Sequence, residues 1–291
     1  MFTQFFGNYL LNKELVSAEH LSEALQSMKD TRLKLGVLAI NAGYMTAAQV
    51  ETAHIQQQRV DKRIGDVMVE LGFLTREQIE ELFNTQPSGH LLLGQALVDK
   101  GYMTNEQFES AINSYKTENS ISDDDIANES DDTSRKFVDQ FYKFSGEKNG
   151  YMVDYVSLLF KNIIRFIGDD FTPLNALPVG GPINNCIVQK TGGGLELVSA
   201  VQANDSAMAV FASRFAKEEI TENDEYSQAC VSEFINLHNG LFAVNMSNDK
   251  GTVVKLQPQY ICDELKKEEV DGGCIIPINF SFGTVNFVIK I

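Results

Sequence analysis

A chain of 291 residues is long enough for two domains of ordinary size, each with its own hydrophobic core. Its hydrophobic content of 43% and charged content of 22% are typical of globular proteins, so we expect most of it to fold. The net charge of −16 disfavours binding to nucleic acid or to anionic membranes.

Targeting signals and metal-ligand patterns are both missing from the sequence. The N-terminal residues lack a basic start, an apolar run and a cleavage site, and no apolar stretch is long enough to cross a bilayer. We therefore expect a soluble cytoplasmic protein that does not insert into membranes. Four cysteines occur singly, so we expect buried thiols that pack as small hydrophobes, and no metal site. They are Cys186, Cys230, Cys262 and Cys274.

A 29-residue repeat occupies residues 1–116. The first glycines of the four copies are Gly7, Gly36, Gly65 and Gly94. Seven residues later stands a second glycine or, in the first copy, Glu14, and three residues after that a serine or threonine. A glycine suits the left-handed position just after a helix ends, and a hydroxyl side chain suits the position just before one begins. The pattern predicts a pair of helices in each copy.

The third copy illustrates one unit. Gly72 ends a short helix, and Thr75 with Gln78 forms a capping box that begins a second helix. The same box recurs at Thr46/Gln49 and Thr104/Gln107. Apolar residues then follow the spacing of one buried helical stripe, at Ile79, Leu82 and Phe83. One such hairpin is too small to bury its apolar face alone, so the copies are expected to pack together.

The two inner copies differ from the outer ones at two positions. Two residues before the first glycine, the four copies carry Phe5, Lys34, Arg63 and Leu92. At the end of the buried stripe they carry Met28, Gln57, Gln86 and Tyr115. The inner copies thus combine a cation with an amide. A cation can neutralise a phosphate, and a glutamine amide can both donate and accept hydrogen bonds.

This pattern resembles the cyclic di-GMP-binding N-terminal domain of MshE-type secretion and pilus ATPases, whose motif stands in two tandem copies. Here the copies run from Lys34 to Gln57 and from Arg63 to Gln86. The resemblance implies a cyclic di-GMP site made by Lys34, Leu35, Gly36, Gln57, Arg63, Ile64, Gly65 and Gln86. Lys34 replaces an arginine and loses its bidentate fork, so weakened binding is expected, and Ile64 replaces a leucine. The alternative is a protein-docking platform whose charged and amide side chains face water.

Acidic and polar residues dominate the segment 117–132, which carries no basic side chain. Such a segment cannot form a core, so we expect a flexible, solvated linker. The expected organisation is four helical repeats over 1–116, a linker over 117–135 and a second domain over 136–291.

The second domain alternates helical and strand-like segments. Long helices are predicted at 153–168 and at about 225–245, with a shorter one at 205–217. Strand patterns occupy 183–189, 194–201, 273–280 and 284–291, and a Thr-Gly-Gly-Gly turn joins the first two. This order is typical of an α+β domain with an antiparallel sheet and two long helices. Together with all-α repeats, it predicts an α+β chain overall.

The second long helix carries the sharpest functional signal. One apolar stripe is expected to face the core, formed by Cys230, Phe234, Leu237, Leu241 and Val244. A second stripe, one residue out of phase with the apolar one, consists of Ala229, Glu233, Asn236 and Gly240. It places a carboxylate and an amide one helical turn apart. A glycine inside a helix costs about 1 kcal/mol relative to alanine, so Gly240 is expected to allow close packing or a partner's approach. His238 falls among apolar residues and is expected to be interior.

The Glu233-x-x-Asn236 pattern, followed by Gly240 and a later proline, resembles the catalytic motif of the CheX/CheC/FliY response-regulator phosphatases. The resemblance implies that Glu233 pairs with a lysine of a phosphorylated CheY-like regulator, while Asn236 orients a water for in-line attack on the aspartyl phosphate. The chain itself would bind no cofactor, because the regulator supplies the magnesium ion. Two departures are Ala229, where the family has Asp or Ser, and Pro258, which comes one residue early.

Three functions stay open at this point. The first is a phosphatase of a CheY-like regulator, with repeats that bind cyclic di-GMP or dock a partner. The second is a non-catalytic adaptor that binds the nucleotide or a protein through its repeats and a partner through its second domain, which Ala229 favours. The third is a structural relative of flagellar-switch components. In the last two, Glu233 and Asn236 are not catalytic and line an exposed helix edge. Whether the chain forms a homodimer also stays open.

Overall fold

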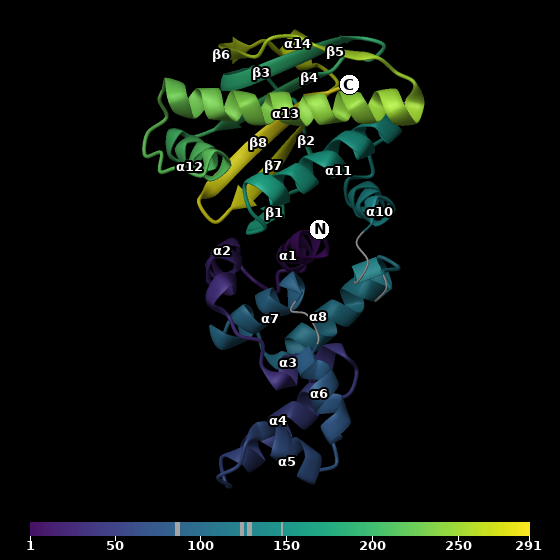
Figure 1. Cartoon of the computed structure of the whole chain (residues 1–291), viewed down its shortest axis with the longest axis vertical. Coiled ribbons are helices and arrows are strands. Elements are labelled where there is room, and N and C mark those ends of the chain that lie inside the picture. The colour runs from purple at the N-terminus through teal and green to yellow at the C-terminus, as the bar shows by residue number, and fades with distance from the viewer. Residues whose placement is uncertain (85–87, 123–124, 127–129, 147) are drawn as a thin grey trace. The chain divides into compact units, whose positions relative to one another are not determined.

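The computed structural model describes residues 1–84, 88–122, 125–126, 130–146 and 148–291 (Figure 1). Residue contacts divide the chain into two compact units. One holds Phe2 and Phe6–Ala127, and the other holds Met1, Thr3–Phe5 and Asn128–Ile291. Within the described residues the first unit is helical and the second combines helices with an antiparallel sheet, which confirms the predicted α+β class. No helix in the described ranges is long and apolar enough to cross a membrane.

Each 29-residue copy contains two helices. They are α1 (Phe2–Asn12) and α2 (Ala18–Ser27), α3 (Leu35–Asn41) and α4 (Ala47–Gln57), α5 (Ile64–Glu70) and α6 (Arg76–Asn84), and α7 (Gly89–Asp99) and α8 (Asn105–Glu118), with a short turn of 3-10 helix, η1 (Met28–Asp30), after α2. In the last three copies the threonine side chain accepts the backbone N–H of the glutamine three residues on. That glutamine's side chain accepts the threonine's own N–H, as the capping box predicts.

The first glycine of a copy has a packing role. A Cβ atom would lie 2.7 Å from Val50 Cγ1 if built on Gly36, 3.3 Å from Ile79 Cδ1 if built on Gly65, and 2.2 Å from Phe108 Cε2 if built on Gly94. Each of these neighbours lies on the second helix of the same copy. Because a side chain would separate the two helices, close packing of the hairpin alone accounts for the repeated glycine.

The second glycine ends the first helix in the left-handed conformation. In the third copy the Phe73 N–H donates to the Met68 carbonyl (2.9 Å) and the Gly72 N–H donates to the Val69 carbonyl (3.0 Å), the paired bonds of a Schellman motif. The φ angles of Gly43, Gly72 and Gly101 are +69°, +73° and +72°. Glu14 takes the same place in the first copy with φ of 55°, although it carries a side chain.

Glu14→Gly is expected to stabilise the repeat unit by about 0.5–1 kcal/mol. A left-handed backbone costs a residue with a side chain about 1–2 kcal/mol, and the greater freedom of glycine in the unfolded chain offsets part of the gain. Urea unfolding followed by circular dichroism measures the change. Gly72→Ala is the reverse control and is expected to lower the urea midpoint. Equal midpoints for the wild type and both variants would contradict a left-handed backbone at positions 14 and 72.

The predicted linker over 117–135 is helical at both ends. α8 extends to Glu118, and α10 (Asp131–Tyr142) begins within the predicted segment. Ser130 caps α10 by accepting the Thr133 N–H, and two aspartates lie in its first turn, where the helix dipole favours negative charge. Part of the acidic run, for which a solvated tether was predicted, therefore begins a helix. Residues 123–124 and 127–129 lie outside the described residues.

An antiparallel sheet is the framework of the second unit. Its strands are β1 (Phe171–Pro173), β2 (Leu177–Pro178), β3 (Ile183–Gly193), β4 (Val198–Ala203), β5 (Val254–Leu256), β6 (Tyr260–Leu265), β7 (Cys274–Phe280) and β8 (Gly283–Lys290). The strand order is β1-β7-β8-β4-β3-β5, with β2 paired to β7 and β6 paired to β3. The predicted hairpin is β3–β4, but Thr191–Gly193, predicted as its turn, belong to β3 and pair with β5. The predicted final strands are β7 and β8. A short helix, α14 (Lys267–Val270), precedes β7.

Three helices lie over one face of this sheet (Figure 1): α11 (Asn149–Phe166), α12 (Asp205–Ala216) and α13 (Glu225–Lys250). Phenylalanine rings fill the space between helices and strands. The ring centroids of Phe211 and Phe234 are 5.1 Å apart, and those of Phe234 and Phe287 are 6.3 Å apart. This aromatic core holds α13 against the strands.

The buried face of α13 differs from the predicted stripe. Of that stripe only Phe234 is buried; Cys230 and Leu237 are half-buried, and Leu241 and Val244 are exposed. The buried residues are Ser227, Val231, Phe234, Ile235, His238, Asn239, Phe242 and Met246. The pattern of apolar residues alone misses two buried polar residues: Asn239, whose amide atoms are satisfied by neighbouring side chains, and His238, whose Nδ1 atom lies next to Asn162. The predicted core stripe is therefore wrong, and the helix is rotated about its axis from the expected position.

Candidate functional site

Glu233 and Asn236 project from one edge of α13. The helix begins after Asp224, whose carboxylate accepts the Ser227 N–H, and it ends at Gly251, which has a left-handed φ of 62°. Its regular backbone keeps the two side chains one turn apart, and Asn236 Nδ2 donates to Glu233 Oε2 over 3.4 Å. Glu233 is exposed and Asn236 is half-buried, so both side chains can be reached from solvent.

Gln189 on β3 fixes the orientation of Asn236. Its Nε2 group donates to Asn236 Oδ1 (3.0 Å) and to the backbone carbonyl of Gln257 (2.9 Å). Gln189 is 1% exposed, so water competes little for these bonds. One lone pair of the Asn236 oxygen is occupied and one Nδ2 hydrogen points to Glu233, so the second lone pair and the second Nδ2 hydrogen remain for a ligand.

A second buried carboxamide supports Gln189. Asn239 Nδ2 donates to Gln189 Oε1 (2.7 Å) and to Ser199 Oγ (2.9 Å), and the Tyr155 hydroxyl donates to Asn239 Oδ1 (2.7 Å). Burial raises the pKa of Tyr155, so its hydroxyl stays protonated and available as a donor. These bonds join α11, β3, β4 and α13 behind Asn236.

Gln189, Asn239 and Tyr155 are site residues that the sequence did not reveal. Gln189 follows the apolar run Cys186–Val188, and Asn239 follows a histidine on the buried face of α13. A polar residue at a buried position needs a partner, so it signals a polar contact in the fold. The signal does not identify the partner, because here the partners are up to 84 positions apart in the chain.

His238 is an interior residue, as predicted. It is 2% exposed, and its Nδ1 atom lies 3.0 Å from Asn162 Nδ2. Burial lowers the pKa of His238 to about 3, so the ring is neutral at physiological pH. The ring therefore contributes packing and polar contacts rather than acid–base chemistry.

An exposed face surrounds Glu233 on α13. Tyr226 and Val244, which lie on the same side of the helix, are 51% and 55% exposed. A Cβ atom on Gly240 would meet nothing within 4 Å, so no neighbour in the described parts of the chain requires a glycine there. A helix-interior glycine without an internal packing reason fits the close approach of a partner.

The two departures from the phosphatase pattern lie near this face. Ala229 is exposed one turn before Glu233. Pro258 lies between Gln257, whose N–H donates to the Lys190 carbonyl (2.9 Å), and Gln259, whose Nε2 group donates to the Ser232 carbonyl (3.4 Å). The proline segment therefore lies beside the turn that carries Glu233. No group of three or more His, Cys, Asp or Glu side chains in the described ranges is arranged to hold a metal ion.

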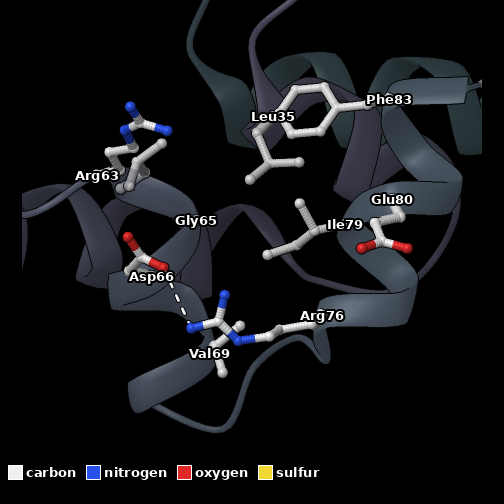
Figure 2. A pocket seen from close by; sticks show the side chains of 10 residues that line it. Leu35, Arg63, Gly65, Asp66, Val69, Arg76, Ile79, Glu80 and Phe83 are labelled. Carbon is white, nitrogen blue, oxygen red and sulfur yellow. Dashed lines mark ion pairs between the residues drawn. The ribbon is translucent and has the colours of Figure 1, made fainter.

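A pocket of about 390 Å³ lies in the repeat unit between α5 and α6. Of the predicted nucleotide ligands, Leu35, Arg63, Ile64 and Gly65 line it, together with Asp66, Val69, Arg76, Ile79, Glu80 and Phe83. Figure 2 shows the side chains of Arg63 and Arg76 at its border and those of Leu35 and Ile79 next to each other in its apolar part. Phe83 is 66% exposed, contrary to its predicted place in a buried stripe, because it faces this pocket.

The other predicted ligands have partners elsewhere. Lys34 Nζ pairs with Asp99 Oδ1 (2.6 Å), and Gln57 Nε2 donates to the Lys62 carbonyl (3.2 Å). Gly36 packs against the second helix of its own copy. Gln86 lies outside the described residues. The pocket thus brings together residues of the second motif copy and takes only Leu35 from the first.

No protein-family model and no curated protein matches the chain. Similar solved structures include the chemotaxis protein CheX from Desulfovibrio desulfuricans, at 12% identity over 47% of this chain and 95% of that one, with a TM-score of 0.40. A CheC-like superfamily protein from Shewanella sp. PV-4 shares 14% identity over 48% of this chain and 95% of that one, with a TM-score of 0.41. A CheX–CheY–BeF3–Mg complex from Borrelia burgdorferi contains a chain with 14% identity over 48% of this chain and 96% of that one, with a TM-score of 0.39.

Gly240→Ala is expected to raise the free energy of unfolding by about 1 kcal/mol, because alanine favours the helix and its methyl group enters open space. Urea unfolding measures the gain. Ala229→Gly, an exposed position on the same helix, is the reverse control and is expected to lower stability by a similar amount. A loss of stability in Gly240→Ala would show that the glycine has an internal packing role.

Proposed function

We propose that the C-terminal unit accelerates the loss of phosphate from the aspartyl phosphate of a CheY-like response regulator. The observation that carries the proposal is the pair of Glu233 and Asn236 on one accessible helix edge, with Asn236 held from behind by a buried glutamine. Their order and spacing also resemble the phosphatase motif.

In the proposed complex each side chain has a separate task. Glu233 pairs with a lysine of the regulator and so places the acyl phosphate next to α13. Asn236 hydrogen-bonds a water molecule opposite the aspartyl oxygen that leaves. The water oxygen bonds to phosphorus as the phosphorus–aspartyl bond breaks, and inorganic phosphate and a free aspartate result. The regulator supplies the magnesium ion that balances charge on the phosphoryl oxygens.

Positioning is the main demand of this chemistry, which explains how an amide can contribute without being acid, base or nucleophile. A carboxamide free to rotate would orient water poorly. Gln189 removes that freedom by bonding to Asn236 Oδ1 (3.0 Å). The exposed Tyr226 and Val244 and the open space at Gly240 provide a surface on which the regulator's backbone can rest.

Asn236→Ala is expected to reduce the acceleration of phosphate loss by about 100-fold while the fold survives, because the variant loses only the water-orienting amide. Phosphate release from CheY-like regulators, phosphorylated in advance with a small phosphodonor, measures the effect. Asn248→Ala, an exposed asparagine near the end of the same helix, is the matched control and is expected to keep the wild-type rate.

Ala229 favours a second candidate, an adaptor without catalysis, since the family pattern has a polar residue at this exposed position. The phosphate-release assay separates the two functions. A wild-type protein that binds a phosphorylated regulator and leaves its half-life unchanged would support the adaptor and contradict the phosphatase.

We also propose that the pocket between α5 and α6 binds cyclic di-GMP. Arg63 and Arg76 supply two cations for the phosphates, and Leu35, Ile79 and Phe83 supply apolar surface for the bases. Asp66 lies 3.6 Å from the Arg76 guanidinium, so this arginine would exchange one anionic partner for another.

Arg63→Ala and Arg76→Ala are each expected to weaken cyclic di-GMP binding about tenfold or more, measured by calorimetry. Arg59→Ala, on the turn after α4, is the matched control and is expected to bind like the wild type. Gln57→Ala distinguishes the observed pocket from the sequence motif, because Gln57 is a motif residue that does not line the pocket. Absence of binding heat at high micromolar nucleotide would contradict the site.

A further inference from the structure

Two cysteines stand opposite each other in the sheet of the second unit. β3 and β6 are antiparallel, and their register pairs Cys186 directly with Cys262. Directly opposed residues of an antiparallel pair have Cα atoms about 4.5 or 5.5 Å apart, and their side chains share one face of the sheet. A disulfide needs a Cα separation of about 4.4–6.8 Å, so this register meets the requirement without backbone movement.

The surroundings of the two thiols differ. Cys186 is 1% exposed within an apolar cluster that includes Val188, Leu265 and Val270, whereas Cys262 is half-buried at the border of that cluster. Burial raises the pKa of the Cys186 thiol to about 12, and the adjacent Cys262, within hydrogen-bonding reach, adds to the increase. Cys186 is therefore protonated at neutral pH, and Cys262 is the thiol that a solute meets first.

The position of β6 gives the outer thiol access. In the described sheet β6 pairs with β3 and lies off the main strand order, whereas β3 is held on its other side by β4. Figure 1 shows β6 at the border of the sheet, away from β7 and β8. An oxidant can therefore reach Cys262 without opening the core.

We propose that Cys186 and Cys262 are a reversible oxidation site that closes to a disulfide on reaction with a low-molecular-weight disulfide. The Cys262 thiolate attacks one sulfur of the small disulfide, which leaves a mixed disulfide on Cys262 and releases one thiol. Cys186 then gives up its proton and attacks the Cys262 sulfur, which releases the second thiol and forms the cross-strand bond. The protein loses two protons and two electrons, and the small disulfide takes them up to become two thiols.

The bond would tie together the strands that support Asn236. Gln189 lies three residues after Cys186 on β3, on the opposite face of the sheet, and Gln257, which accepts a bond from Gln189, lies just before β6. The loop that the bond closes includes α12 and α13. Oxidation is therefore expected to stabilise the second unit, whether or not the Glu233–Asn236 pair is catalytic.

Oxidised glutathione, added to the reduced full-length protein under native conditions, tests the proposal. The expected product has an intact mass about 2 Da below that of the reduced protein, a peptide map that joins Cys186 to Cys262, and a Tm higher by about 5 °C or more. Dithiothreitol is expected to reverse all three changes.

Cys262→Ser is expected to lose the mass change, whereas the half-buried controls Cys230→Ser and Cys274→Ser are expected to keep it. The peptide map of the wild-type protein shows whether Cys186 and Cys262 form the disulfide even if a variant folds poorly. Glutathione retained on Cys262 with Cys186 still a free thiol, or a disulfide between any other pair, would overturn the proposal.

Discussion

Two buried carboxamides, Gln189 on β3 and Asn239 on α13, connect the helix layer to the sheet. Each is at most 1% exposed, and an unsatisfied amide in such a place costs about 1–3 kcal/mol. Asn239 Nδ2 donates to Gln189 Oε1, and Tyr155, Ser199 and the Gln257 carbonyl bond the remaining groups of the two amides. These hydrogen bonds form only in one orientation of α13 about its axis. Any other orientation would leave several buried polar atoms without partners.

That orientation decides which residues of α13 face outward. With Asn239 turned toward the sheet, Glu233 is exposed and Asn236 lies at the border, where Gln189 can hold its oxygen. The same orientation exposes Leu241 and Val244. An outward face with one carboxylate, one oriented amide and several apolar side chains is suited to docking a protein and positioning a water. Structure and proposed function thus depend on the same polar contacts.

Local features were predictable from the sequence and long-range ones were not. Capping boxes such as Thr75/Gln78 and the left-handed turn at Gly72 involve residues at most a few positions apart, so their chemistry is visible in the sequence. The phase of α13 depends on Asn239, whose partners lie 40 to 84 positions away. The sequence predicted part of the repeat pocket. Arg63 belongs to the nucleotide-binding motif, whereas Arg76, which is not among the predicted ligands, lines the pocket from the next helix.

A double-mutant cycle on phosphate release with Gln189→Met and Asn236→Ala tests whether Gln189 acts by holding Asn236. Methionine keeps the length of glutamine and removes its hydrogen bonds, and circular dichroism checks that the fold persists. If Gln189 acts by holding Asn236, Gln189→Met is expected to slow the wild-type protein about tenfold or more and to leave the Asn236→Ala protein unchanged. An equal loss in both backgrounds, or a wild-type rate in folded Gln189→Met, would show that Gln189 does not act by holding Asn236.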